Sequence, residues 1–219
     1  GENKPVAAEV GLGSRVAAIT STFTQGNLTH VENPFSVALE GDGFFQIRTE
    51  SGELQYTRDG SFEISPVANG NMLCTSDGNP VLDAYGNQII LPSNRVATDL
   101  VVNQDGTLAF PDGTGNPAVI TDANGRPVKF GIYQFNNPAG LSKEGSNNYS
   151  VTVASGAAVA ENGNAAVKQT KTHQYYTEAS NVDVANEMVN LIVAQRAYEM
   201  NSKAIQASDE MMQQANALR

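Results

Sequence analysis

The most constraining feature of this sequence is the point at which glycine and proline stop occurring. Both residues recur from Gly1 to Gly163, and neither occurs again before Arg219. Because they mark turns and break helices, the first part should be rich in turns and the last part can form one uninterrupted helix. We therefore expect a β-rich body over residues 1–163, an extended connection over residues 164–179 and a long helix over residues 180–219. Within the connection, residues 173–178 fit a last strand equally well.

The expected body consists of short apolar or alternating runs separated by turn residues. Asp-Gly and Asn-Gly pairs favour tight hairpins, and they predict turns at Asp59-Gly60, Asp105-Gly106 and Asn124-Gly125. Further strands fit residues 15–23, 35–39, 43–48, 88–91 and 149–153. The fold class is thus mainly β, with a barrel or sandwich of short antiparallel strands and one long C-terminal helix.

The C-terminal segment carries apolar side chains with a helical period. Ser180 followed by Asp183 resembles a helix-start capping arrangement, and the helix would be roughly 55 Å long. One stripe has the alternating spacings of a coiled-coil seam and comprises Val184, Met188, Leu191, Tyr198, Ile205 and Met212. A second stripe, expected on a neighbouring face, comprises Val182, Ala185, Val189, Val193, Met200, Ala204, Ala207, Met211 and Leu218. So wide an apolar surface predicts several neighbours and marks these residues as an assembly interface.

A helix that simply covers its own domain is the alternative interpretation. It is disfavoured because about 55 Å of helix would extend past a β-body that spans on the order of 35 Å. The chain also offers no second long helical segment as a partner. Since it begins with Gly-Glu-Asn-Lys-Pro and no Met, we expect the natural protein to start earlier. The partner helices would then lie in that earlier part or in other molecules.

Charge and composition narrow the choice of partners. The formal net charge is −10 and the sequence pI is about 4.6. Affinity for nucleic acid rests on Lys and Arg, and an anionic lipid surface repels such a chain, so the expected partner is protein. No apolar run approaches the roughly 18 residues of a membrane span, and the start does not resemble a signal peptide. The single cysteine, Cys74, lies in an apolar run and is expected to be buried and inert.

The residue pattern predicts no catalytic site, cofactor or metal. His30 and His173 lack a metal-ligand spacing, and no Gly-x-Ser-x-Gly supports a Ser-His-Asp triad. Six residues are interpreted as structural turn residues: Gly41, Gly43, Asp59, Gly60, Asp105 and Gly106. The acidic turns leave a carbohydrate-binding or carbohydrate-hydrolysing β-domain open as an alternative.

Several segments match a known pattern in the same order along the chain. They lie within residues 11–28, 39–46, 56–62 and 177–204, and they include Gly41-Asp42-Gly43-Phe44-Phe45 and Tyr56-Thr57-Arg58-Asp59-Gly60. Together they resemble the axial proteins of the bacterial flagellar rod and hook. The run from Gln195 to Lys203, Gln-Arg-Ala-Tyr-Glu-Met-Asn-Ser-Lys, is most similar to the distal-rod type.

The resemblance implies a structural subunit rather than an enzyme. Its partners would be copies of itself in a helical filament, together with other rod and hook subunits. The C-terminal helix would pair with an N-terminal helix in the inner layer of that filament. The family also implies export through the flagellar type III apparatus without a cleaved signal peptide, and a final place in the periplasmic rod of the basal body. A proximal-rod or hook relative is the nearest alternative.

Overall fold

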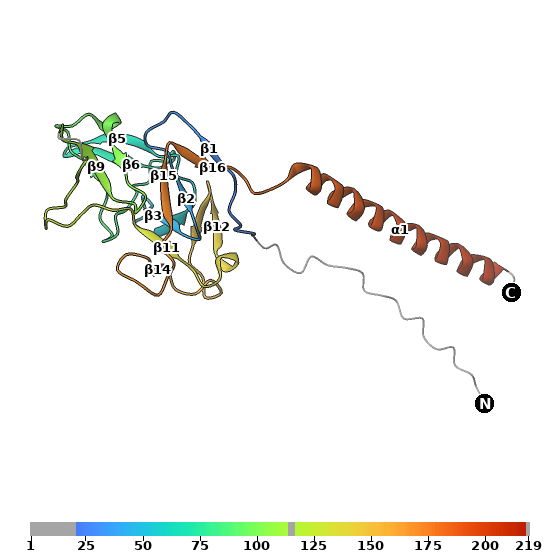
Figure 1. Ribbon diagram of the computed structural model, residues 1–219. Helices are drawn as coiled ribbons and strands as arrows, with labels where there is room; N and C mark the ends of the chain where they lie inside the picture. Colours follow the sequence, from blue (N-terminus) through green and yellow to red (C-terminus); the bar gives the residue numbers. More distant parts are fainter. Residues whose placement is uncertain (1–20, 114–116, 218–219) are drawn as a thin grey trace. The chain divides into compact units, whose positions relative to one another are not determined.

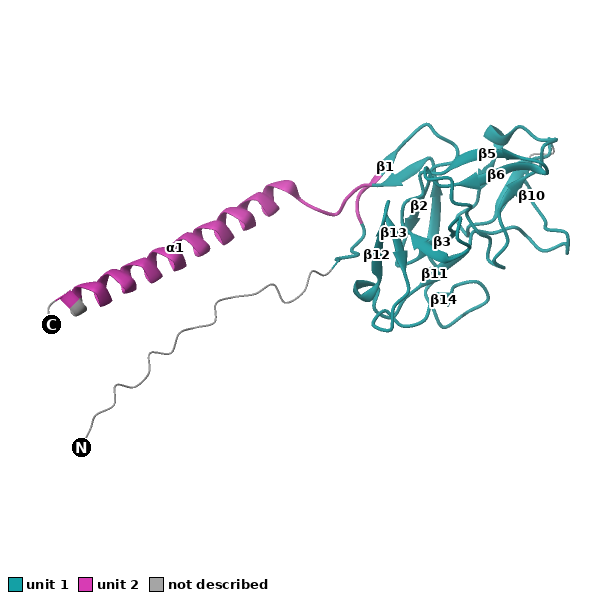
Figure 2. Ribbon diagram, turned by 180° about the vertical axis from the view of Figure 1, so that it is seen from behind, with its two compact units in different colours: residues 1–25, 29–178 teal, residues 26–28, 179–219 magenta. Residues whose placement is uncertain are grey.

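The computed structural model describes residues 21–113 and 117–217, and for residues 215 and 216 only the backbone. The chain divides into two compact units, residues 1–25 with 29–178 and residues 26–28 with 179–219 (Figure 2). The first unit consists of short antiparallel strands, and the second contains a single helix (Figure 1). The prediction of a mainly β fold with one C-terminal helix is therefore confirmed. Part of the strand expected at residues 15–23 lies outside the described residues, and residues 21–23 are not in a strand.

The largest sheet of the body has six antiparallel strands in the order β12-β13-β4-β3-β11-β14. Its strands are β3 (Phe44–Arg48), β4 (Leu54–Thr57), β11 (Ile132–Gln134), β12 (Ser142–Gly145), β13 (Asn148–Ser150) and β14 (Val159–Ala160). Strand β3 is central: its Phe45 pairs with Thr57 of β4 and with Ile132 of β11. Because β3 and β11 are distant in sequence, this sheet ties the middle of the chain to its beginning.

Besides this sheet, the described residues form four smaller sheets. Two have three strands, namely β5 (Glu63–Val67), β6 (Gly70–Cys74) and β7 (Ile90–Leu91), and β8 (Val101–Val102), β9 (Leu108–Pro111) and β10 (Pro117–Val119). Two have two strands, β2 (Val37–Glu40) with β15 (Lys171–Gln174) and β1 (Leu28–His30) with β16 (Tyr176–Glu178). Short 3-10 turns lie at η1 (Ala97–Asp99) and η2 (Pro138–Gly140). Within residues 21–113 and 117–217, none of the sheets closes into a barrel.

The three predicted hairpins have different outcomes. The hairpin at Asp105-Gly106 is confirmed, since β8 pairs directly with β9. The hairpin at Asp59-Gly60 is wrong, because β4 pairs with β3 and β13 whereas β5 pairs with β6. Here the chain passes from one sheet to another, and the Gly60 carbonyl accepts the amide of Val37 at 2.9 Å. The turn at Asn124-Gly125 is formed, but β11 beyond it joins the six-stranded sheet.

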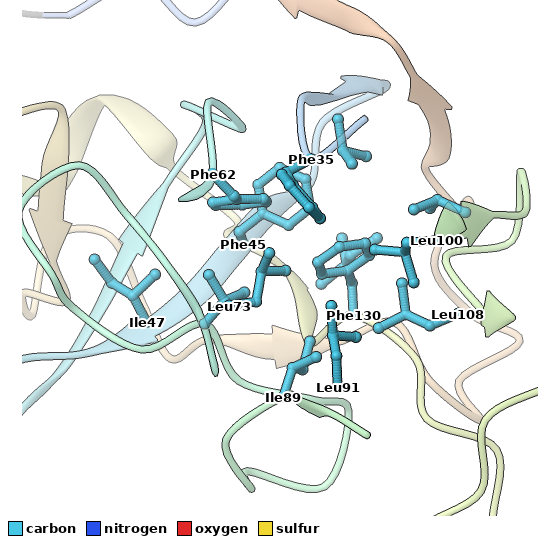
Figure 3. Close-up of a cluster of buried hydrophobic side chains, with 14 of the residues drawn as sticks. Phe35, Phe45, Ile47, Phe62, Leu73, Ile89, Leu91, Leu100, Leu108 and Phe130 are labelled. Atoms are coloured by element: carbon cyan, nitrogen blue, oxygen red, sulfur yellow. The ribbon is translucent and has the colours of Figure 1, made fainter. Parts of the chain in front are cut away.

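Aromatic and aliphatic side chains from several sheets fill the core of the body. Phe45, Phe62 and Phe130 form its centre: the ring centroids of Phe45 lie 4.9 Å from Phe62 and 5.2 Å from Phe130 (Figure 3). Burying one such side chain stabilises a fold by about 1.5–3 kcal/mol, and an edge-to-face pair adds about 0.5–1.5 kcal/mol. Cys74 is buried at the edge of this region, as predicted. Its thiol donates to the Glu63 carbonyl.

Residues 164–179, expected as a connection, contain the strands β15 and β16. Strand β15 extends the body, because Thr172 is buried and pairs with Leu39 of β2. Between the two strands, Tyr175 adopts a left-handed φ of 65°, a conformation that bulky residues rarely adopt. The chain changes partner strand at this kink. The body thus continues to Glu178, where the first compact unit ends.

The C-terminal helix, α1 (Val184–Ala217), has 34 residues and a length of about 51 Å. It begins at Val184, later than the expected Ser180. Asp183 acts as the N-cap: its Oδ1 accepts the Ala185 amide at 3.0 Å, and its carbonyl accepts the Glu187 amide. Ser180 Oγ accepts the Val182 amide at 3.3 Å, in the residues before the helix. The cap therefore lies three residues after the position that the Ser180 pattern suggested.

Candidate assembly interface

The long helix exposes large apolar side chains along its whole described length. Leu191 is 60% exposed, Tyr198 77% and Met200 66%. The same holds for the other predicted interface residues inside the helix, which are Val184, Met188, Val189, Val193, Ile205, Met211 and Met212. Val182 is also exposed but precedes the helix, and Leu218 lies outside the described residues. So large an apolar surface is characteristic of a site that binds another protein segment.

The two apolar stripes lie on nearly opposite sides of the helix, not on neighbouring faces. Successive residues of an α-helix are rotated by roughly 100°, so Leu191 and Met200, nine residues apart, point about 180° away from each other. Leu191, Tyr198 and Ile205 follow a seven-residue repeat, which keeps one stripe on one side. A single straight partner helix can cover only one of two opposite stripes. Covering both stripes would take neighbours on both sides.

Two of the predicted turn residues, Gly41 and Gly43, lie just before β3 in a crowded place. Gly41 has a φ of +136°, and a Cβ on Gly43 would lie 2.5 Å from the Ile132 side chain and 2.6 Å from Thr170 Oγ1. The Gly43 amide donates to that same Thr170 hydroxyl at 3.1 Å. Glu161, itself buried, accepts the hydroxyl and the amide of Thr170. Only glycine lets the 41–43 turn approach these groups.

The side chain of Arg58 holds this turn from the other side. Its Nη1 donates to the carbonyls of Gly41 and Gly43 at 2.8 and 3.0 Å. Its Nε and Nη2 both contact Oε2 of Glu178, at 3.0 and 2.9 Å, and both side chains are nearly buried, with 13% and 11% exposed. The guanidinium also lies over the Phe44 ring, 5.7 Å from the centroid. This fork geometry suits arginine, which presents several donors in one plane.

Gln25 completes the arrangement, which we call the Arg58 cluster: Gln25, Gly41, Gly43, Arg58 and Glu178. Gln25 Nε2 donates to Glu178 Oε1 at 3.0 Å and to the Leu39 carbonyl at 2.9 Å. Gln25 Oε1 accepts the Gly41 amide at 3.0 Å. Residues up to 153 positions apart thus meet within hydrogen-bond distance.

The Arg58 cluster was not predicted from the sequence, although all its members lie in segments that carry the family resemblance. Gln25, Arg58 and Glu178 belong to three different segments, and no local pattern links an arginine to a glutamate 120 positions away. The sequence shows the order of the four segments along the chain. Which of their residues contact one another is determined by the three-dimensional fold.

The turn carboxylates of Asp59 and Asp105 accept hydrogen bonds from their own loops, and Asp59 Oδ2 also accepts the Asn147 side-chain amide. Asp59 Oδ1 accepts the Ser61 amide, and Asp105 accepts both the amide and the hydroxyl of Thr107. Burial raises the pKa of Asp105, but the Thr107 hydrogen bonds and the nearby Lys129 outweigh it, so the pKa is lowered overall. These hydrogen bonds give both carboxylates a structural role, which is to hold the turns in shape.

The two histidines both lie beside Tyr176. His30 stacks on Tyr175, and His173 Nε2 lies 2.7 Å from Glu40 Oε2. Over the part of the chain that the structure describes, no group of three or more His, Cys, Asp or Glu could hold a metal ion. In the same residues, no helix combines the length and the apolar character needed to cross a membrane.

Comparisons with known proteins identify the class to which this architecture belongs. Residues 38–110, in the β-body, match the family described as the flagellar hook protein FlgE/F/G D1 domain. Residues 173–218, which contain β16 and α1, match the C-terminal region of the flagellar basal body rod FlgEFG proteins. Both models describe proteins of the flagellar hook and rod, and the matches lie in part of the body and in the helix.

Full-length relatives narrow this class. The chain is 38% identical to the flagellar basal-body rod protein FlgG of Borreliella burgdorferi over 99% of its own length and 76% of that protein. It is 35% identical to FlgG of Bacillus subtilis, over 94% of this chain and 73% of that protein. The flagellar hook-basal body complex protein FlhP of Bacillus subtilis is 32% identical over 98% and 76%. The chain belongs to the FlgG family of flagellar basal-body rod proteins.

Proposed function

We propose that this protein is a structural subunit of the flagellar basal-body rod, in which copies of the chain pack through α1 into a helical filament that transmits torque. The observation that supports this function most directly is the helix itself, with apolar stripes exposed on two opposite sides. A helix in water gains little stability from its backbone alone. Neighbours that cover its exposed apolar side chains would supply that missing stability.

The identity of the neighbours follows from the same geometry. Copies of one subunit arranged around an axis place each helix between two others, which covers opposite stripes at the same time. Helices of other rod and hook subunits would meet the ends of such an array. Export through the flagellar type III apparatus and a periplasmic position belong to this proposal as properties implied by the family.

A genetic experiment tests the function in the bacterium that carries the gene. Deleting the gene should abolish swimming, and the full-length gene should restore it. A gene that lacks the codons for residues 180–219 should fail to restore it, since the packing surface is removed. Swimming restored by the shortened gene would refute the role of α1.

Single substitutions separate the apolar stripes from the rest of the helix. Leu191→Asp places a charge in one stripe and Met200→Asp places it in the other. The matched controls are Asn190→Asp and Asn201→Asp, which add the same charge at adjacent polar positions. Losing a buried side chain of this size should weaken association of the purified protein by about ten- to a hundredfold. We expect this loss, and loss of swimming, only for the two apolar positions; equal behaviour of all four variants would contradict the two-sided interface.

A further inference from the structure

The Arg58 cluster lies where the chain leaves the first compact unit after Glu178. Gln25 is the last residue of this unit before residues 26–28, and Glu178 is its last residue before residues 179–219. Their side chains are hydrogen-bonded to each other at 3.0 Å. The connection to the helical unit therefore starts beside Gln25, inside the Arg58 cluster.

Arg58 links this point to the central strands of the largest sheet. Arg58 directly follows β4, and the 41–43 turn that it binds directly precedes β3. The incoming segment is held a second time by Phe23, whose ring packs edge-on against Phe44 of β3 at 5.3 Å and Tyr149 of β13 at 5.1 Å. A polar contact and an aromatic contact thus fasten the same short segment to the six-stranded sheet.

The strength of the polar contact comes from its charge and its partial burial. A charge-assisted hydrogen bond is stronger than a neutral one, and a two-donor contact of arginine with a carboxylate also fixes orientation. Surface ion pairs contribute little because water screens them. The Arg58–Glu178 pair is largely removed from water, and a third side chain, Gln25, occupies the other carboxylate oxygen.

We propose that Arg58 is a positioning residue: it clamps the segments at Gln25 and Glu178 to the 41–43 turn and forms the mechanical joint between the β-body and the connection that begins after Glu178. Force on this connection passes through the joint into β3 and β4 instead of peeling β1 and β16 from the body. The role in force transmission rests on the proposed function as a rod subunit. The clamp itself is a property of the isolated chain.

Amide hydrogen exchange of the purified protein tests the clamp. Arg58→Met keeps the length and apolar stem of the side chain and removes its donors. The Gly41 amide, which donates to Gln25, and the Val31 amide, which donates to Tyr175 beside β16, should then exchange about ten- to a hundredfold faster. The core amides of Leu73 and Val81 should keep their rates.

Arg126→Met is the matched control. Arg126 also forms an ion pair, 2.7 Å from Asp122, and also lies over an aromatic ring, that of Tyr85. Its pair is local, four residues apart, and joins no distant segments. This variant should leave the Gly41 and Val31 amides unchanged. Two results with Arg58→Met would overturn the clamp. One is equally faster exchange at Gly41, Val31 and the two core amides, and the other is unchanged exchange at Gly41.

Glu178→Gln supplies a second variant should Arg58→Met fail to fold. It preserves the shape of the side chain and removes the charge, so the same two amides should exchange faster by a smaller factor. Unchanged exchange at both amides in this variant would also overturn the clamp.

Swimming of the bacterium in viscous medium tests the force-bearing role separately from the function. If deletion of the gene leaves swimming intact, the proposed function fails, whatever Arg58 does. If deletion abolishes swimming, Arg58→Met should impair swimming in viscous medium, while Arg126→Met should not. Equal swimming of the two variants would overturn the joint and leave the rod function standing.

Discussion

Adding one methyl group at Gly60 tests how the β-body is held together. A Cβ at this position would lie 1.8 Å from the carbonyl oxygen of Val37 and 3.2 Å from the Phe45 ring. Since real contacts of this kind stay beyond 3.0 Å, the backbone at Val37 has to move by more than an ångström. The Gly60 carbonyl also accepts the amides of Val37 and Phe62, both at 2.9 Å. All three neighbours contribute to the main hydrophobic core.

The magnitude of the Gly60→Ala effect follows from these contacts. Forcing extra volume into a packed core costs about 1–3 kcal/mol, and each lost hydrogen bond costs a further amount of about 1 kcal/mol. We therefore expect the free energy of unfolding to fall by about 3–5 kcal/mol, against a typical domain stability of about 5–15 kcal/mol.

Gly52→Ala is the control, and urea unfolding followed by near-UV circular dichroism is the assay. Gly52 has a φ of +89° and no atom within 4 Å of an added Cβ. The left-handed conformation costs alanine about 1–2 kcal/mol, and reduced freedom of the unfolded chain offsets about 0.4–1 kcal/mol of it. The control should therefore lose only about 1 kcal/mol. If Gly60→Ala is destabilised no more than Gly52→Ala, Gly60 is only a turn residue and the argument from close approach fails.

Two further predictions concern ionisable groups of the body. The amide and side chain of Arg126 hold the pKa of Asp122 below its ordinary value of 3.8, so this carboxylate stabilises the fold above that value and the contribution is lost as the pH falls through the lowered pKa. Thermal melts should show Asp122→Asn less stable than the natural chain near neutral pH, with the gap closing in strong acid; a gap independent of pH would contradict this. Burial raises the pKa of the Cys74 thiol, with a smaller contribution from Glu63, so an aromatic disulfide reagent should react with it far more slowly in the folded protein than in urea. Equal rates in the two states would show that Cys74 is accessible.

The division of the chain into a β-rich body and a C-terminal helix could be predicted because it depends on local chemistry. Glycine and proline disfavour a helix wherever they occur, so their absence after Gly163 permits one. The Asp105-Gly106 hairpin was predictable for a similar reason, since the turn and both strands lie within a few residues. The ordered segments that identify the family are likewise a property of the sequence alone.

Only the tertiary structure determined which strands pair and which strands each turn connects. Asp59-Gly60 carries the same local signal as Asp105-Gly106, yet β4 pairs with β3 and β13 because the larger sheet buries Phe45 and Tyr56 there. In the same way, Arg58 and Glu178 find each other only after β15 and β16 return to the body. For the helix α1, the sequence alone shows the spacing of its apolar side chains. Their exposure on opposite sides follows from one continuous helix over Val184–Ala217. Local propensity acts over a few residues, and burial selects among pairings across the whole chain.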